Sequence, residues 1–154
     1  MKLREIMSAP PVFVYPETPL WRAARAMGEG DCEFLPVVQN GVPIGVLTMG
    51  DLLATIASDG KCPFSTYAVD VMSAPAVGLS MEAGLPEAAA TMLDHRVHRL
   101  VVVDERGILR GVVSQNDLSA NLDSSTVSPS KYDALSEPEL LHVHQPWLPA
   151  TYAA

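Results

Sequence analysis

Basic residues are scarce in this sequence. Ten Lys and Arg stand against 18 Asp and Glu among 154 residues, so the formal net charge is −8. Nucleic-acid backbones and anionic membrane surfaces attract clustered Lys and Arg. Long hydrophobic runs are also missing, because Pro, Gly or a charge interrupts each apolar stretch well before the roughly 18 residues that span a bilayer. We therefore expect neither a nucleic-acid polymer nor a membrane as a partner.

The sequence has few cysteines, and its first residues do not show the apolar pattern of a signal peptide. The two cysteines, Cys32 and Cys62, belong to no CxxC pair and have no neighbouring His, so the sequence predicts no zinc site and no redox dithiol. His142 and His144 alternate near the C-terminus, but two His alone do not make a metal site. The first residues hold charges and Pro10-Pro11 in place of an apolar signal segment. Two free thiols without a signal peptide predict a cytoplasmic location.

Motifs of catalysis are missing as well. The chain has no Gly-x-Ser-x-Gly elbow, no Gly-rich loop ending in Lys, and no carboxylate pair spaced for acid–base work. We therefore expect no enzymatic activity. What the chain does have is 48% apolar and only 18% charged residues, which predicts a folded core rather than a disordered polyelectrolyte.

The chain contains an internal repeat. Met7-Ser8-Ala9-Pro10 recurs 65 residues later as Met72-Ser73-Ala74-Pro75. After one inserted residue, the seven residues Gly45 to Asp51 correspond to Gly111 to Asp117. Self-similarity of this kind indicates a duplicated structural unit.

Each repeat shows the same order of periodicities. An extended segment (12–14; 77–79) precedes an amphipathic helix, and a hairpin and a second helix follow. The first helix has Leu20, Ala23, Ala24 and Met27 on one face, with Thr18 as its expected N-cap. The fold class is thus α/β (α+β), with two β-α-β-β-α units sharing one core. We place repeat 1 at 1–58, a linker at 59–66, repeat 2 at 67–120, and an irregular Pro/Ser-rich tail at 121–154.

These units, each closing on Gly-apolar-apolar-Thr/Ser-x-x-Asp, resemble tandem cystathionine-beta-synthase (CBS) domains, a pair known as a Bateman module. The resemblance covers residues 3–120. The stretch from Val97 to Glu105 also resembles the gamma subunit of AMP-activated protein kinase. The resemblance implies a pseudo-twofold module that binds adenine nucleotides between its repeats and forms a homodimer.

The residue types at the Thr/Ser-x-x-Asp positions are suited to contact a phosphate and a ribose. Thr48 and Ser114 stand where a strand ends and a helix begins, and a helix N-terminus attracts phosphate. Their hydroxyls can donate to a phosphate, while the carboxylates of Asp51 and Asp117 can accept both hydroxyls of a ribose. The same residues also make capping boxes, which hold a helix start with no ligand at all. The two roles can coexist.

The resemblance also implies how the repeats share two clefts. Asp51 and Thr48 would face a wall from repeat 2, and Asp117 and Ser114 a wall from repeat 1. The first wall comprises Ala76, Val77, Val97, His98 and Arg99, with His98 and Arg99 near phosphates, and the second comprises Pro11 and Val12. Because Glu33 and Phe34 replace His98 and Arg99 in repeat 1, only the Asp51 cleft is expected to be fully equipped for an anion.

Two functions follow as hypotheses. The first is a stand-alone regulatory sensor that binds AMP, ADP, ATP or S-adenosylmethionine between the repeats and signals by a change of conformation or dimer geometry. The second is a ligand-free dimeric scaffold that acts through its tail, where Trp147 and Tyr152 could contact a protein partner.

Overall fold

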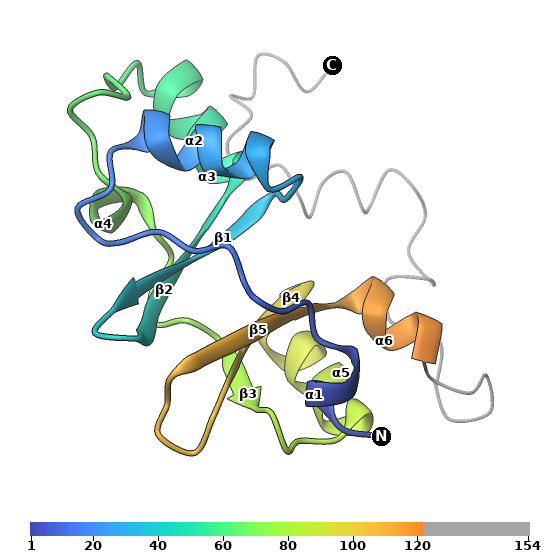
Figure 1. Cartoon of the computed structure of the whole chain (residues 1–154). Helices are drawn as coiled ribbons and strands as arrows, with labels where there is room; N and C mark the ends of the chain where they lie inside the picture. Colours follow the sequence, from blue (N-terminus) through green and yellow to red (C-terminus); the bar gives the residue numbers. More distant parts are fainter. Residues whose placement is uncertain (122–154) are drawn as a thin grey trace, which may run out of the picture. The chain divides into compact units, whose positions relative to one another are not determined.

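The structure is a computed structural model that describes residues 1–121. Each repeat contains one antiparallel β-hairpin (Figure 1). In repeat 1, β1 (Phe34–Gln39) pairs with β2 (Val42–Thr48). In repeat 2, β4 (Arg99–Val103) pairs with β5 (Leu109–Ser114), and β3 (Gly78–Ser80) adds to β4 in parallel. The expected tail, with its aromatic and His residues, lies outside the described residues apart from Asn121.

Helices flank both hairpins at matching positions. Helix α2 (Leu20–Glu29) precedes the first hairpin and α5 (Leu85–His95) the second. After the hairpins come α3 (Met49–Leu53), which continues as the π-helical turn η1 (Ala54–Ser58), and α6 (Gln115–Asn121). Each repeat also begins with a four-residue helix that the sequence analysis missed, α1 (Leu3–Ile6) and α4 (Ala68–Val71). The predicted pair of β-α-β-β-α units is otherwise confirmed.

The amphipathic faces read from the sequence form the core. Leu20, Ala23 and Met27 of α2 are buried, as are their α5 equivalents Leu85, Ala88 and Met92. They belong to a core that includes the hairpin residues Leu35, Val37, Leu47, Leu100, Val102 and Val113. Burial of this apolar surface is the main favourable term in folding.

The first strand of repeat 1 is shorter than predicted. Of residues 12–14, only Val14 pairs, through a single parallel bridge to Val37. Its N–H donates to the carbonyl of Pro36 at 3.0 Å and its carbonyl accepts from Val38 N–H at 2.8 Å. Prolines at 10, 11 and 16 carry no N–H and therefore cannot extend a ladder in either direction.

The prediction of Thr18 as the N-cap of α2 was wrong. The helix begins at Leu20 with Pro19 in the capping position, and Pro19 makes no side-chain cap. The Thr18 hydroxyl instead accepts a hydrogen bond from the N–H of Tyr15 at 3.0 Å. The Thr18 side chain therefore closes the preceding turn.

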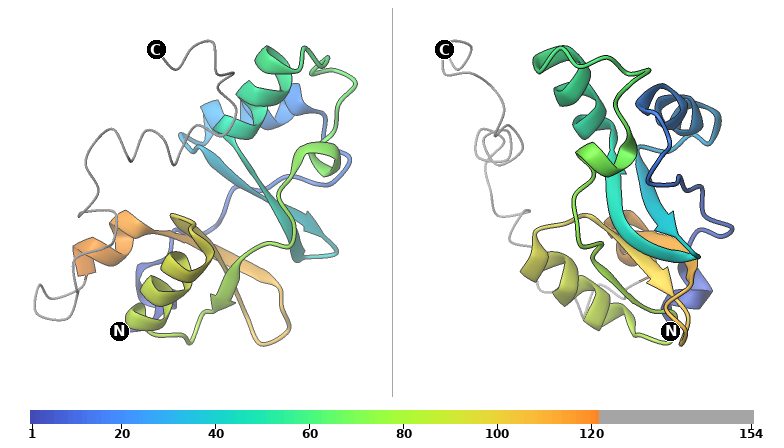
Figure 2. Two further views of the ribbon diagram at one scale, coloured as in Figure 1. Left: turned by 180° about the vertical axis from the view of Figure 1, so that it is seen from behind. Right: turned by 90° about the vertical axis from the view of Figure 1, so that its left-hand side faces the viewer.

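The first segment of each repeat packs against the other repeat. Ser8, after α1, exchanges two backbone hydrogen bonds with Val112 of β5 (2.9 and 3.2 Å), and Ser73, after α4, exchanges two with Val46 of β2 (both 2.9 Å). Accordingly α1 lies beside β5 and α6, and α4 beside β2 (Figures 1 and 2). The exchange ties the two halves together and gives the module its pseudo-twofold symmetry.

Glycine is required where the exchanged segments cross the strands. A Cβ on Gly111 would lie 2.7 Å from Met7 Sδ and 2.9 Å from the Ser8 carbonyl oxygen. A Cβ on Gly45 would meet Met72 and Ser73 in the same way, at 2.6 and 2.9 Å. This close backbone approach is the structural reason for the Gly that opens each Gly-apolar-apolar-Thr/Ser-x-x-Asp sequence.

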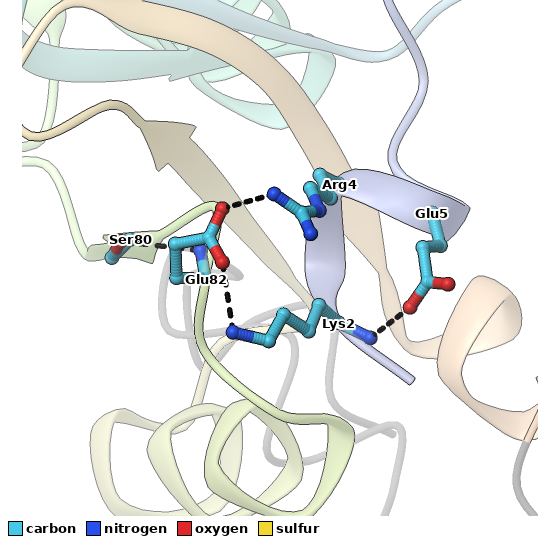
Figure 3. Close-up of polar contacts among 5 residues, drawn as sticks. All are labelled: Lys2, Arg4, Glu5, Ser80 and Glu82. Atoms are coloured by element: carbon cyan, nitrogen blue, oxygen red, sulfur yellow. Dashed lines mark hydrogen bonds and ion pairs between the residues drawn. The ribbon is translucent and has the colours of Figure 1, made fainter.

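Helix α1 is fixed to repeat 2 by one buried and several exposed contacts. Leu3 is fully buried, and its N–H donates to the carbonyl of Ala83 at 3.0 Å. Glu82 forms ion pairs with Lys2 at 2.8 Å and Arg4 at 2.6 Å (Figure 3). The hydrogen bond from Lys2 is the main cause that lowers the pKa of the Glu82 carboxyl. Because exposed ion pairs are screened by water and salt and contribute little, Leu3 is the stronger anchor.

Replacing Gly111 with Ala should weaken the exchange. Because the new Cβ would press on the Ser8 backbone, we expect the free energy of unfolding to fall by about 1–3 kcal/mol, measured by urea denaturation. Gly28 is the matched control, since a Cβ there meets nothing within 4 Å and Ala is favoured by up to about 1 kcal/mol in a helix. A Gly111→Ala protein as stable as wild type would contradict the proposed crossing.

The Glu82 ion pairs should give a pH-dependent contribution to stability. Since the pKa of Glu82 is lowered in the folded state, its contribution is present above the ordinary carboxyl pKa and is lost as pH falls through the lowered value. We expect Glu82→Gln to have a lower Tm than wild type near neutral pH, and the difference to disappear at acidic pH once Glu82 is protonated in the folded and unfolded states. Glu17→Gln, at an exposed residue that forms no ion pair with residues 1–121, should show no such pattern.

Candidate functional site: the cleft at Asp117

Both Thr/Ser-x-x-Asp sequences form capping boxes. At the start of α3, Asp51 Oδ2 accepts from the N–H of Thr48 at 2.8 Å, and the Thr48 hydroxyl accepts from the N–H of Asp51 at 3.2 Å. At the start of α6, Asp117 Oδ2 accepts from the N–H of Ser114 at 2.7 Å and from its hydroxyl at 2.6 Å. The capping role weighed from the sequence is therefore present in both repeats.

Capping leaves part of each carboxylate available. Within residues 1–121, the Oδ1 atoms of Asp51 and Asp117 accept no hydrogen bond. Both residues are half-buried. Each Asp can thus cap its helix with one oxygen and accept a ligand's hydroxyls with the other.

A cleft of about 480 Å³ opens at Asp117. This volume lies within the range of small-molecule sites, roughly 300–1,000 Å³. Residues of both repeats line the cleft. Repeat 2 contributes Arg99, Val112, Ser114 and Asp117, and repeat 1 contributes Ser8, Pro10, Pro11, Val12 and the five-residue turn Gly30 to Phe34.

The segment exchange positions one repeat 1 wall of this cleft. The pairing of Ser8 with Val112 holds the following residues, Pro10 to Val12, against the end of β5. There β5 delivers Ser114, and α6 delivers Asp117 one turn later. The cleft therefore contains residues more than 100 positions apart in sequence because the segment after α1 pairs with β5.

The turn Gly30 to Phe34 forms the other repeat 1 wall. It follows α2 directly, with Asp31 in the left-handed region at a φ of 48°. The N–H of Cys32 donates back to Met27 of the helix at 3.0 Å, and the carbonyl of Glu33 accepts from the N–H of Met49 at 3.0 Å. These backbone bonds anchor the turn between α2 and α3.

The charges on the cleft are unevenly distributed. The lining has three carboxylates, on Asp31, Glu33 and Asp117, and one guanidinium, on Arg99. Within residues 1–121, Asp31, Glu33 and Arg99 form no ion pair. Burial is the main cause that raises the pKa of the Cys32 thiol, so this thiol adds no negative charge near neutral pH.

The structure brings together the four residues named for the second cleft. Pro11, Val12, Ser114 and Asp117 all line the 480 Å³ space, and their role in binding stays a prediction. Arg99, which the sequence assigned to the Asp51 cleft, lines the Asp117 cleft, because it begins β4 and pairs with Ser114. The sequence analysis missed Asp31 and Cys32, although their alignment with Arg96 and Val97 could have identified them.

The residues named for the Asp51 cleft occupy equivalent positions in the other half. Ala76, Val77, Val97, His98 and Arg99 lie 65 residues after Pro11, Val12, Cys32, Glu33 and Phe34, all of which line the Asp117 cleft. The backbone contacts repeat too: the carbonyl of His98 accepts from the N–H of Gln115 at 2.9 Å, as that of Glu33 does from Met49. The His98 ring also contacts Gln115, with Nδ1 2.9 Å from Oε1.

Among residues 1–121, no group of three His, Cys, Asp or Glu side chains could hold a metal ion. Within the same range, no helix is long and apolar enough to cross a membrane.

Comparison with known proteins identifies relatives in archaea and bacteria. The chain is 31% identical to the CBS domain-containing protein YhcV of Bacillus subtilis over 87% of its length and 94% of that protein. It is 30% identical to the uncharacterized protein MK0525 of Methanopyrus kandleri over 75% of its length but only 57% of that protein. A shorter match, 31% over 63% of the chain, covers 19% of an inosine-5'-monophosphate dehydrogenase of Nitrosopumilus maritimus.

Solved structures share the fold. Hypoxic Response Protein I with two coordinated zinc ions matches 80% of the chain and all of that protein, with 27% identity and a TM-score of 0.72. The CBS domain pair of MJ0100 in complex with 5'-methylthioadenosine and S-adenosyl-L-methionine matches 78% and 94%, with 21% identity and a TM-score of 0.70. CBSX2 of Arabidopsis thaliana in complex with AMP matches 77% and 93%, with 23% identity and a TM-score of 0.66.

The duplicated unit itself matches a family model. The model of the CBS domain matches twice, at residues 3–58 and 68–124. The two matches follow the repeat found in the sequence and the two hairpin units seen in the structure. The chain belongs to the CBS domain family, as a tandem pair that forms one Bateman module.

Proposed function

We propose that the chain is a non-catalytic regulatory module that binds an adenosine-containing ligand, a nucleotide or S-adenosylmethionine, between its repeats. The observation that carries this proposal is the cleft at Asp117, which both repeats line and into which a half-buried carboxylate with an unused oxygen is set. A carboxylate in this position suits the paired hydroxyls of a ribose, because it can accept two hydrogen bonds.

The rest of the lining suits a nucleoside. Pro11, Val12 and the Phe34 ring supply apolar surface for a purine base. The Ser114 hydroxyl lies next to Asp117 and adds a polar group near the sugar. Adenosine-containing ligands occur on this fold in the complexes of MJ0100 and CBSX2, which supports the ligand class.

Ligand binding can produce a signal because residues of both repeats form the walls of the cleft. A ligand in the cleft contacts both repeats, so its binding energy favours one relative arrangement of them over others. By linkage, any partner that prefers that arrangement binds more tightly when the ligand is present. We propose a cytoplasmic homodimer as the working form, with exposed apolar residues such as Leu53 on α3 and Leu93 on α5 as candidate dimer contacts.

The alternative is a dimeric scaffold in which the capping boxes serve the helices alone. The two acidic side chains on the wall, Asp31 and Glu33, favour this alternative if the ligand must carry phosphate. Ligand binding decides between the two functions.

Binding should be visible as thermal stabilisation. We expect adenosine, S-adenosylmethionine, AMP, ADP or ATP to raise the Tm of the full chain, and GMP to leave it unchanged. A ligand at about 100 times its dissociation constant stabilises the folded state by about 2.7 kcal/mol. The shift should disappear when Asp51→Asn and Asp117→Asn are combined, and no shift with any adenosine compound at millimolar concentration would favour the scaffold.

Capping and binding by Asp117 should separate in two variants. Asp117→Ala removes the acceptor of the Ser114 N–H, so we expect the ligand-free protein to lose about 0.5–1.5 kcal/mol of unfolding free energy. Asp117→Asn keeps an amide oxygen for the Ser114 N–H but removes the charge, so its stability should stay near wild type in urea denaturation. If Asp117→Asn also leaves ligand binding at this cleft unchanged, the carboxylate is a cap only.

A further inference from the structure

The turn that follows the first helix of each repeat has the same backbone but opposite charge. In repeat 1, Asp31 has a φ of 48°, and the carbonyl of Glu33 caps the start of α3. In repeat 2, Arg96 has a φ of 55°, and the carbonyl of His98 caps the start of α6. The fold therefore fixes the backbone conformation of this turn but not the charge of its side chains. Asp31 and Glu33 in repeat 1 occupy the positions of Arg96 and His98 in repeat 2.

The acidic turn is a wall of the Asp117 cleft. Asp31 and Glu33 both line the cleft, and neither is neutralised by an ion pair within the described part of the chain. Arg99 is the one basic residue among the lining, against three carboxylates. A ligand that enters this space therefore meets net negative charge, which salt screens in part because Asp31 and Glu33 are exposed.

We propose that the Asp117 cleft selects an adenosine ligand that carries no phosphate, with a neutral or cationic group in its place. This inference rests on the proposed function and names the ligand class of that same site. A phosphate brings up to two negative charges next to Asp31 and Glu33, which raises the free energy of the complex, whereas a sulfonium or ammonium group is attracted by the same carboxylates. Asp117 can hold the ribose in either case.

The equivalent cleft supports this assignment by contrast. The residues at the matching positions around Asp51 are Arg96 and His98, which would attract a phosphate rather than repel it. Because the turn keeps its backbone while Arg96 takes the place of Asp31, we expect a cleft at Asp51 to differ from the Asp117 cleft in the ligands that it accepts.

Adenosine and AMP make a clean pair of probes, since they differ only by the phosphate. Isothermal titration calorimetry would be run on the full chain with Asp51→Asn, in which the other cleft lacks its carboxylate. We expect adenosine to bind at least about tenfold more tightly than AMP at low salt, and the difference to shrink as salt screens the repulsion. Adding Asp117→Asn should abolish the heat of adenosine binding, and this loss would assign the binding to the Asp117 cleft.

Removing the acidic side chains of the turn tests whether their charge causes the preference for adenosine over AMP. In the same background, Asp31→Asn with Glu33→Gln should raise AMP affinity about tenfold and change adenosine affinity less than about threefold. Asn tolerates the left-handed conformation at position 31, so the turn is kept. Asp59→Asn with Glu105→Gln removes the same charge from exposed residues outside the cleft lining and should leave the ratio of the two affinities unchanged.

The outcomes separate this inference from the proposed function. If AMP binds the Asp117 cleft as tightly as adenosine, or if the Asp31 and Glu33 substitutions leave the ratio unchanged, charge selection is wrong while nucleoside binding stands. If neither adenosine nor AMP binds the Asp51→Asn protein or wild type at millimolar concentration, both are overturned.

Discussion

The module depends on one backbone interaction made twice: the first segment of each repeat pairs with the last strand of the other, Ser8 with Val112 and Ser73 with Val46. These pairs satisfy polar backbone groups on the outer edges of β5 and β2 and bring α1 and α4 onto the opposite repeat. They require Gly45 and Gly111, where a side chain would collide with the crossing segment. They also carry Pro11 and Val12 to the end of β5, so the same contacts that hold the fold together build a wall of the cleft.

The Asp at each helix start illustrates how one side chain can serve structure and function. Asp51 and Asp117 use Oδ2 to cap their helices, and the capping bonds fix the orientation of the carboxylate. A fixed carboxylate loses little conformational entropy when a ligand binds to its other oxygen. The cap is therefore a reason to expect a preorganised site.

Much of the architecture could be read from the sequence because it is local or repeated. The spacing of Leu20, Ala23 and Met27 specified a buried helix face, and the duplicated Gly-to-Asp sequences located both hairpin ends. The short helices α1 and α4 were missed, since four residues give no measurable periodicity and are stabilised by contacts across the repeats. The strand expected at 12–14 shrank to a single bridge because neighbouring prolines cannot donate hydrogen bonds.

The sequence by itself determined the duplication, the fold class and the four residues Pro11, Val12, Ser114 and Asp117 that the structure brings into one cleft. The alignment of Glu33 and Phe34 with His98 and Arg99 already indicated a cleft poorly equipped for an anion, but it was not used to place Asp31 there, and it assigned Arg99 to the other cleft. Those placements depend on how two distant segments pack against the end of β5, and side-chain charge in a loop has no periodicity that would reveal its direction. Tertiary structure decided that Asp31 and Arg99 join Glu33 and Asp117 around one cleft.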